Sequence, residues 1–341
     1  MGVFKNLSER FGSRDIAIDL GTATVLVYVE GRGVVINEPS VVAINTETNK
    51  IFKVGREAQT MMGRTSERVK TIRPLKNGVV VQYDVTLHML EYFIKAACGD
   101  MFFRPRVMIC IPGSVSDVER RAVMDAAIEA GARSVQLISE PLAAAIGAGC
   151  RVNVPEGHLI VDIGGGTTDV AVVSLGGIVV SESIKVAGDQ FDEAIVRHVK
   201  NKYRVHIGER TAEQIKIRIG AVYEHKNIKT MKVRGRCMTE GLPKEITISS
   251  REMLEAMKDP ISEIIEAICR VVEKTPPELI PDIINNGITM TGGGSLLAGL
   301  DRLLADVTGI RAAVADDPVC CVVKGMGKSL SRLSDNIEDN S

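Results

Sequence analysis

Two segments of this chain, about 140 residues apart, share one pattern. Residues 16–29 read IAIDLGTATVLVYV, and residues 159–173 read LIVDIGGGTTDVAVV. Each begins with an aliphatic strand, continues through Asp-x-Gly and small hydroxyl residues, and ends with a second aliphatic strand. A repeat at such a long spacing predicts two related α/β halves rather than a short-period solenoid.

The composition excludes several other classes of protein. The 341 residues include 42 Lys and Arg against 43 Asp and Glu, and this net charge of −1 predicts no nucleic-acid partner. Hydrophobic residues make up 45% of the chain but aromatic residues only 4%, so we expect an ordered, aliphatic core. No apolar run reaches the roughly 18 residues of a membrane-spanning helix. Seven Cys without a C-x-x-C motif, and no signal-peptide pattern, indicate reduced thiols and a cytoplasmic protein.

Hydrophobic periodicity and capping signals predict alternating strands and helices. Ser116 lies three residues before Glu119, and this capping box predicts a helix over 116–130. One long helix is expected over about 250–274, and another over 295–307. Strands are expected at 15–20, 25–29, 34–36, 41–44, 107–111, 134–138, 159–162, 169–175, 178–180 and 288–291, a strand pair within 230–248, and further helices at 84–98 and within 189–225.

The turn that follows each Asp-x-Gly is suited to binding phosphate. Glycine lets the backbone approach an anion closely, and a turn rich in Gly and Thr can aim several N–H groups at it. Asp19 and Asp162, at the strand ends, would repel phosphates unless Mg²⁺ intervened. Two ordinary β-hairpins are the alternative. The turn residues are Gly21, Thr22, Ala23 and Thr24 in the first, and Gly164, Gly165, Gly166, Thr167 and Thr168 in the second.

Two further glycine-containing segments need separate interpretation. Residues 288–295, ITMTGGGS, predict a strand, a turn that permits close approach of a flat or anionic group, and a helix start. Residues 325–329, GMGKS, resemble the end of a P-loop, but Val322 stands where G-x-x-x-x-G-K-[ST] requires its first glycine. We therefore expect a helix start or a surface turn at 325–329.

Several segments match a known family when they are taken together. They are DLGTAT at 19–24, DIGGGTTD at 162–169, ISEPLAAAIGAG at 138–149, TMTGGGS at 289–295, NEPSVVAI at 37–44, IRPLKNGV at 72–79, GERTAEQIK at 208–216 and TPPEL at 275–279. The chain thereby resembles the actin/sugar-kinase/heat-shock-chaperone ATPase superfamily, and within it the MreB/Mbl family of bacterial actin homologues, over about residues 14–330.

The resemblance implies a fold and its subdivisions. The fold class would be α/β, with the actin-like ATPase fold: two duplicated, ribonuclease H-like α/β lobes around a nucleotide cleft, each with a small inserted subdomain. Four subdomains would follow: IA at 1–41, 84–146 and 321–341; IB at 42–83; IIA at 147–187 and 253–320; and IIB at 188–252.

The resemblance also implies ATP and Mg²⁺ as cofactors and assigns roles to residues. Glu140 and Asp162 would be catalytic, Glu140 by orienting the attacking water, while Asp19 and Asp162 would hold Mg²⁺ through waters. Thr24 departs from the usual Asn of relatives, which puts a side-chain contact there in doubt. The nucleotide-binding positions would be Thr22, Ala23, Thr24, Gly164, Gly165, Gly166, Glu213, Gln214, Ile215, Lys216, Gly292, Gly293, Gly294 and Ser295.

Without the family, simpler interpretations of some of these residues stay open. Glu140 would be a first-turn glutamate favoured by the helix dipole. Glu213 and Lys216, three residues apart on one helix face, would form a surface ion pair of little energetic value.

Two segments could contact a membrane. One is an amphipathic stretch whose apolar face holds Val3, Phe4, Leu7 and Phe11; the other is Met101, Phe102 and Phe103, beside Arg104 and Arg106 that would suit anionic headgroups. A disordered terminus is the alternative for the first segment, and ordinary core burial is the alternative for the second. Many weak anchors in a polymer would add by multivalency, so we expect lipid binding that depends on polymerisation.

The family implies a cell-shape-determining cytoskeletal protein. It would form ATP-dependent antiparallel double filaments on the inner face of the cytoplasmic membrane, hydrolyse ATP slowly, contact membrane-spanning cell-shape and cell-wall synthesis proteins, and scaffold peptidoglycan synthesis. The alternative is a soluble metabolic kinase of the same superfamily, for which we find no sugar-binding segment. A chaperone ATPase would need a further peptide-binding domain, and no G-x-G-x-x-G follows a strand as a Rossmann dehydrogenase requires.

Overall fold

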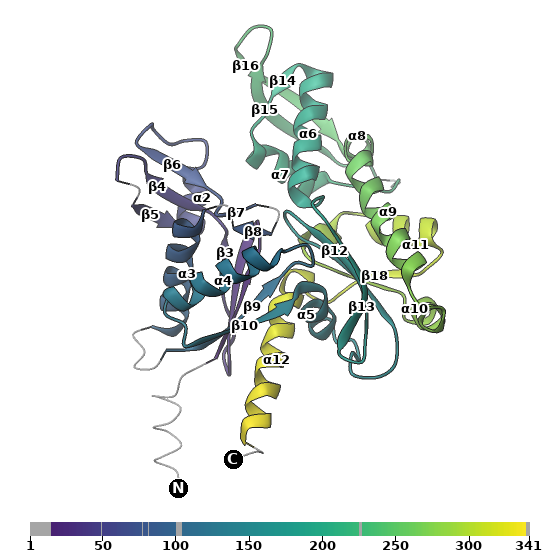
Figure 1. The fold of residues 1–341 in the computed structure, drawn as a ribbon. Helices are drawn as coiled ribbons and strands as arrows, with labels where there is room; N and C mark the ends of the chain where they lie inside the picture. Colours follow the sequence, from purple (N-terminus) through teal and green to yellow (C-terminus); the bar gives the residue numbers. More distant parts are fainter. Residues whose placement is uncertain are drawn as a thin grey trace. The chain divides into compact units, whose positions relative to one another are not determined.

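The computed structural model describes residues 15–48, 50–76, 78–80, 82–99, 104–224 and 227–338 (Figure 1). The chain divides into two compact units, one formed by residues up to 151 together with those from 320 onward, and the other by residues 152–319. Within the described residues, no helix is both long and apolar enough to cross a membrane. The finer division into four subdomains stays a prediction.

The first unit is built on a five-stranded mixed sheet in the order β10-β9-β1-β2-β3. Strands β1, β2 and β3 form an antiparallel meander, while β9 lies parallel to β1 and β10 parallel to β9. The strands are β1 (Ile16–Leu20), β2 (Thr24–Val29), β3 (Gly33–Pro39), β9 (Arg106–Ile111) and β10 (Ser134–Ser139).

The second unit repeats this topology strand for strand. Its sheet has the order β18-β17-β11-β12-β13, again an antiparallel meander extended by two parallel strands. The predicted duplication and the α/β fold class are therefore confirmed. The strands are β11 (His158–Ile163), β12 (Thr168–Ser174), β13 (Gly177–Ile184), β17 (Ile288–Thr291) and β18 (Ala312–Val314).

The two Asp-x-Gly hairpins correspond residue for residue. The last pair before the turn is Leu20 with Val25 in the first unit and Ile163 with Thr168 in the second. Each hairpin therefore has a four-residue turn, and Asp19 and Asp162 each stand one residue before the last paired residue. The duplication thus extends to the position of the two carboxylates.

Helices and small sheets complete the first unit. Helix α4 begins with the predicted capping box: Ser116 N–H donates to Glu119 Oε2 at 2.8 Å, and Glu119 N–H donates to Ser116 Oγ at 3.4 Å. Phe93, Met89 and Leu90 pack against the sheet as a buried cluster with its aliphatic residues. The helices are α2 (Arg56–Met61), α3 (Tyr83–Cys98), α4 (Asp117–Glu129), α5 (Glu140–Gly147) and α12 (Cys321–Glu338), and the small sheets contain β4 (Val42–Asn45), β5 (Ile51–Val54), β6 (Val69–Ile72), β7 (Leu75–Lys76) and β8 (Val79–Val80).

The expectation of a helix start or surface turn at 325–329 is wrong, because this segment lies inside α12. Helix α12 packs closely on α5. A Cβ at Gly325 would overlap the carbonyl oxygen of Ala143, and one at Gly147 would overlap that of Cys321. The glycines are therefore explained by backbone-to-backbone helix packing rather than by phosphate binding.

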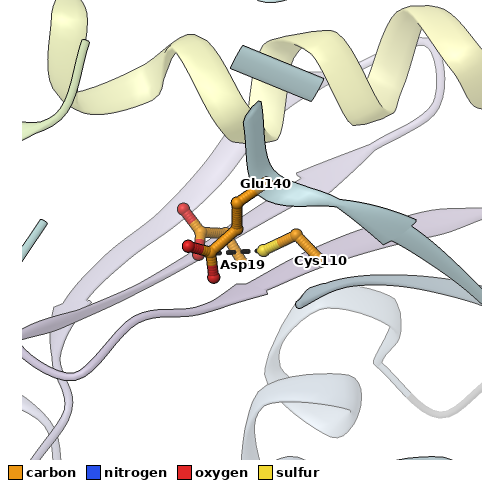
Figure 2. Close-up of side chains that lie close together, drawn as sticks. All are labelled: Asp19, Cys110 and Glu140. Carbon is orange, nitrogen blue, oxygen red and sulfur yellow. Dashed lines mark hydrogen bonds between the residues drawn. The ribbon is translucent and has the colours of Figure 1, made fainter. Parts of the chain in front are cut away.

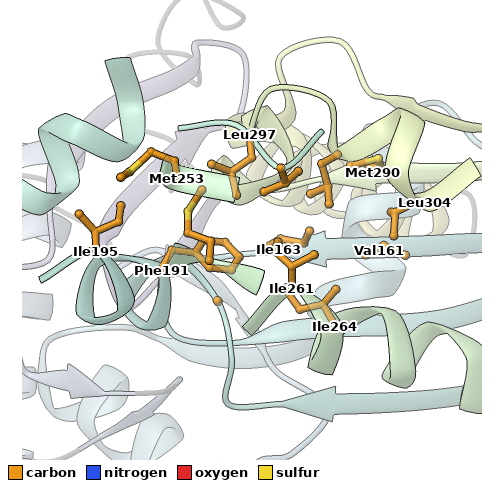
Figure 3. Close-up of a cluster of buried hydrophobic side chains, with 14 of the residues drawn as sticks. Val161, Ile163, Phe191, Ile195, Met253, Ile261, Ile264, Met290, Leu297 and Leu304 are labelled. Carbon is orange, nitrogen blue, oxygen red and sulfur yellow. The ribbon is translucent and has the colours of Figure 1, made fainter. Parts of the chain in front are cut away.

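The second unit contains a large aliphatic core, part of which Figure 3 shows. Phe191 and Ile195 of α6, Ile163 of the sheet and Ile261 of α9 all belong to this cluster. The elements outside the main sheet are α6 (Gly188–Tyr203), β14 (Val205–His206), α7 (Glu209–Ile219), β15 (Thr230–Cys237), β16 (Pro243–Ser249), α8 (Ser250–Ala256), α9 (Lys258–Lys274), the 3-10 helix η1 (Pro277–Leu279), α10 (Ile280–Asn286), η2 (Gly293–Leu296), α11 (Leu300–Thr308) and η3 (Pro318–Cys320).

Two predicted helices of this unit are interrupted. The single helix expected over 250–274 breaks at Met257 into α8 and α9. In a continuous helix, Pro260 could not donate to the carbonyl of Ala256 and its ring would clash there, whereas in the first turn of α9 it needs no partner. The segment after Gly294 forms a 3-10 turn, and α11 begins only at Leu300.

Candidate functional site

The carboxyl ends of three neighbouring strands in the first unit bring together Asp19, Cys110 and Glu140 (Figure 2). Asp19 is on β1 and Cys110 on the adjacent parallel strand β9, where Ile18 pairs with Ile109, so the two follow the same register. Glu140 begins α5 directly after β10. One ligand atom from each of the three side chains lies within 4.8 Å of the other two. Ligands in open α/β sheets bind at this edge of the strands.

Burial sets the protonation of this cluster. It raises the pKa of Asp19 to about 6, although a hydrogen bond from Cys110 Sγ to Asp19 Oδ1, at 3.2 Å, acts in the opposite direction. Burial, and then the carboxylates of Asp19 and Glu140, raise the pKa of the Cys110 thiol well above its usual range. The thiol is therefore neutral at pH 7 and acts as a hydrogen-bond donor.

The donor set of this cluster fits a hard divalent cation. Asp19 and Glu140 hold two carboxylate groups close together, and their repulsion would be relieved by a cation. Carboxylate oxygens are the ligands that Mg²⁺ prefers, often through its waters, whereas a protonated thiol is a poor ligand. The residues present thus fit a hydrated Mg²⁺ beside Asp19, with Glu140 within reach of its waters and Cys110 orienting Asp19.

The first glycine turn is fixed by two contacts with the rest of its unit. Gly78 N–H donates to Thr22 Oγ1 at 3.0 Å, and Thr22 is almost fully buried. Ser40 N–H donates to the carbonyl of Ala23 at 2.9 Å. Thr24 begins β2, opposite Pro39 of β3. Hydrogen bonds from Gly78 and Ser40 thus fix the conformation of this turn, which directly follows the end of β1 that carries Asp19.

In the second unit, Asp162 is held by the last residue of β17, directly before the glycine-rich segment. Thr291 Oγ1 donates to Asp162 Oδ1 at 2.7 Å, and the two residues pair across adjacent parallel strands. Gly292 follows with a φ of 78°, and a Cβ there would lie 2.9 Å from Asp162 Oδ1 and overlap the carbonyl of Ile163. Ser295 Oγ closes the turn by donating to the carbonyl of Gly292 at 2.7 Å. The fold therefore brings Asp162 close to residues 292–295 within the second unit.

The second glycine turn is tied to the start of α6. Gly164 N–H donates to the carbonyl of Thr167 across the turn at 2.9 Å. The carbonyls of Gly164 and Gly165 accept from the N–H groups of Gly188, at 3.2 Å, and of Asp189, at 2.7 Å. The turn's carbonyls thus face the helix that follows β13, and this arrangement fixes the conformation of the turn.

The predicted positions on α7 have different surroundings from one another. Ile215 is fully buried in the core, so its side chain packs rather than binds a ligand. Lys216 pairs with Asp192 of α6, with Nζ 2.8 Å from Oδ2, instead of forming the surface pair with Glu213 that its spacing allowed. Glu213 and Gln214 are half-buried. Sequence reasoning missed Asp192, since no local signal links positions 192 and 216.

The predicted membrane contacts fall outside the described residues. This holds for Val3, Phe4, Leu7 and Phe11, and for Met101, Phe102 and Phe103. Both flanking arginines are described: Arg104 is exposed, and the guanidinium of Arg106 pairs with the buried carboxylate of Asp15 at the start of the sheet. Arg106 therefore has a structural partner within its own unit.

Nearly the whole chain is similar to known proteins. Residues 13–338 match the family described as MreB/Mbl protein. The chain is 48% identical over 322 residues to the cell shape-determining protein Mbl of Bacillus cereus, covering 94% of this chain and 97% of that protein. It is also 48% identical over 327 residues to the cell shape-determining protein MreB of Escherichia coli, covering 94% of each.

Solved structures agree with these sequence matches. The crystal structure of MreB5 of Spiroplasma citri bound to ADP superimposes with a TM-score of 0.92 at 39% identity, covering 96% of this chain and 99% of that one. The same protein bound to AMPPNP also gives a TM-score of 0.92, covering 97% of this chain and 99% of that one.

Proposed function

This chain belongs to the MreB/Mbl family, and from that premise we propose that it is an actin-like, ATP-dependent cytoskeletal protein that determines cell shape. Two relatives at 48% identity are named as cell shape-determining proteins. These relatives support the cytoskeletal interpretation rather than the metabolic kinase. This function requires nucleotide binding, which the two Asp-x-Gly hairpins of the chain support.

The observation that carries the proposal is the equivalence of the two Asp-x-Gly hairpins. Both have four-residue turns, and both place a carboxylate one residue before the last strand pair. We propose that these turns, with the Gly292–Ser295 segment, bind ATP. A relative at 39% identity has been crystallised with ADP and with AMPPNP, which supports this ligand class.

We propose that the protein hydrolyses ATP slowly with Mg²⁺. When bound, Mg²⁺ would neutralise charge on the phosphates and would be held by Asp19 and Asp162 through waters. Glu140, in the first turn of α5 and close to Asp19, orients the attacking water and accepts its proton. Cys110 keeps Asp19 oriented through the hydrogen bond to Oδ1. The turn residues hold the phosphates in line with that water, since positioning dominates phosphoryl transfer.

We further propose where the protein works and what it contacts. It would be cytoplasmic and peripheral on the inner face of the membrane, where it self-assembles into antiparallel double filaments. Membrane-spanning cell-shape and cell-wall synthesis proteins would be its partners, and the filaments would scaffold peptidoglycan synthesis and maintain rod shape. ATP would favour subunit contacts, and hydrolysis would weaken them.

Sedimentation tests the proposed function. The protein should pellet after addition of ATP and Mg²⁺ and stay in the supernatant with EDTA. The variant Asp162→Asn, which should bind Mg-ATP poorly, provides the matched control and should pellet far less. Equal amounts in the pellet with and without nucleotide, for both proteins, would overturn the proposal.

Flotation with anionic liposomes tests the membrane part separately. Wild-type filaments should float with the liposomes, whereas the protein without nucleotide should remain at the bottom. Removing residues 1–12, or replacing Phe102 and Phe103 by Ser, should weaken flotation and show which segment is the anchor. Equal flotation with and without nucleotide would contradict a polymer-dependent attachment.

A further inference from the structure

The small sheet formed by β14, β15 and β16 has one face in the core of the second unit and one face in solvent. Side chains alternate along β15, so Val233 and Cys237 are buried on the inner face. Every residue on the opposite side of these three strands from Lys232 to Arg236 is exposed. We call this surface the basic face; it consists of Lys232, Arg234 and Arg236 of β15, His206 of β14, and Pro243, Glu245 and Thr247 of β16.

The basic face lies in a cationic part of a nearly neutral chain. Residues 201–250 contain 11 Lys and Arg against 5 Asp and Glu, a net charge of +6, whereas the whole chain carries −1. Alternate residues of a strand are about 6.7 Å apart, which is within the roughly 8 Å over which exposed charges interact at physiological salt. The three cations of β15 therefore repel one another, and cross-strand pairs of opposite charge would stabilise the sheet better. Sheet stability does not explain this arrangement.

Glu245 shows how the basic face binds a carboxylate. Arg234 Nε donates to Glu245 Oε2 at 2.9 Å, and Lys232 Nζ lies 3.4 Å from Oε1. These contacts, first with Arg234 and then with Lys232, lower the pKa of Glu245. The Arg234 and Lys232 side chains are still 84% and 76% exposed, so both keep donors for a second carboxylate. Arg236 has no bonded partner among the residues that the structure describes.

We propose that the basic face binds an acidic, extended segment of a partner protein. An extended chain repeats its side chains every two residues, so carboxylates at alternate positions match the spacing of the three cations. The face carries no Phe, Tyr or Trp on which the bases of a nucleic acid would stack. A membrane-binding surface has apolar side chains among its cations. Here the exposed Met238 and Leu242 lie at one end, in the loop between β15 and β16, where an apolar residue of the segment would contact them.

Fluorescence anisotropy of a labelled peptide tests the proposal on the whole chain. The probe is a synthetic peptide of alternating Glu and Thr, compared with a peptide of the same composition that has all its Glu in one block. The alternating peptide should bind more tightly, and raising the salt concentration should weaken its binding. The basic-face variant, Lys232→Gln with Arg234→Gln and Arg236→Gln, should lose about tenfold or more in affinity.

A matched control separates the basic face from the net charge. Lys200→Gln, Arg210→Gln and Arg218→Gln together replace three exposed cations of α6 and α7, and should keep the affinity within about twofold of the wild type. Both triple variants should unfold at about the wild-type temperature, because they change exposed side chains. Equal affinity of the wild type and the basic-face variant for the alternating peptide would overturn the proposal, as would equal affinity of the wild type for the two peptides.

Two further measurements separate other occupants of the basic face. Flotation with phosphatidylserine vesicles that is lost in the basic-face variant, without peptide binding by the wild type, would assign the face to lipid and overturn the proposal. The basic-face variant should pellet with ATP and Mg²⁺ like the wild type. Failure to pellet would make the face a contact between copies of the chain and would also overturn it. Peptide binding by a wild type that does not pellet with nucleotide would overturn the proposed function alone.

Discussion

At the residue scale, burial governs the behaviour of Asp19. Burial raises its pKa from 3.8 to about 6, so the folded state favours the neutral carboxyl. The stabilising contribution of this proton is fully present below about pH 4 and is lost as the pH rises through about 6. At pH 8 the ligand-free protein therefore carries an unfavourable buried charge, which a bound cation would compensate.

The variant Asp19→Asn should remove this pH dependence. One pKa unit corresponds to about 1.36 kcal/mol, and partial contact with solvent reduces the effect, so we expect about 1–2 kcal/mol of added stability at pH 8. Urea unfolding of the ligand-free wild type and of Asp19→Asn, at pH 4 and at pH 8, measures the difference in their free energies of unfolding. This difference should be near zero at pH 4. A variant that is less stable than the wild type at pH 8 would show that the cluster holds Asp19 in its charged form.

Glu140 allows a test of hydrolysis that is separate from binding. The variant Glu140→Ala should slow phosphate release by about 100-fold or more, since general-base catalysis contributes about that much. Its affinity for ATP should stay within about threefold of the wild type, because the group is assigned to the water rather than to the nucleotide. Phosphate release at the wild-type rate would refute the assigned role.

At the element scale, Glu252 joins α8 to the end of α6. Burial alone would raise its pKa, but hydrogen bonds from Tyr203, Lys202 and Ser249 outweigh it and lower the pKa to about 2. Tyr203 Oη and Lys202 Nζ approach Oε2 at 2.8 and 3.0 Å, and Ser249 Oγ donates to Oε1 at 2.9 Å. Because the folded-state pKa is lowered, this stability is present above about pH 4.5 and is lost as the pH falls toward about 2.

The variant Glu252→Gln should therefore lose about 1–2 kcal/mol of stability at pH 7, because its hydrogen bonds from Tyr203 and Lys202 are no longer to a charged group. The loss should shrink at pH 3, where part of the wild-type contribution has already gone. Chemical unfolding at both pH values provides the measurement, with the exposed Glu255→Gln of the same helix as the control. An equal loss at pH 7 and pH 3 would contradict the charge-based explanation.

The α5–α12 contact provides a second element-scale test. The variant Gly325→Ala forces a methyl group against the carbonyl of Ala143 and should destabilise the protein by about 2 kcal/mol or more. Gly208→Ala, where a Cβ meets nothing within 4 Å, should cost less than about 1 kcal/mol. Thermal unfolding of the two variants gives the comparison, and equal stability would contradict close packing at Gly325.

The elements also show how far sequence reasoning reaches. The two hairpins and the capping box of α4 were predictable, because strand pattern, turn chemistry and capping are local signals. The glycines of α12 were misinterpreted, since their cause is the backbone of α5, about 180 residues away in the sequence. The Asp192–Lys216 pair was missed for the same reason. Contacts between separate helices, unlike turns, leave no fixed spacing to recognise.

At the scale of the whole molecule, duplication gives each unit its own carboxylate-bearing glycine turn. In the first unit, Asp19 lies with Cys110 and Glu140, while in the second unit Asp162 is bonded to Thr291 and the turn is braced by α6. The two halves have therefore diverged in the groups around an equivalent aspartate. We infer that the first unit supplies the group that acts on water, and that the second supplies the more rigid phosphate-binding turn.

We propose that both turns bind one nucleotide, and calorimetric titration with ATP and Mg²⁺ tests this proposal most directly. The wild type should bind one ATP per chain. Asp19→Asn and Asp162→Asn should each weaken Mg²⁺-dependent binding by about tenfold or more, because each would remove one of the carboxylates that the proposed function assigns to Mg²⁺. Wild-type affinity in either variant, with the chain folded, would contradict the account.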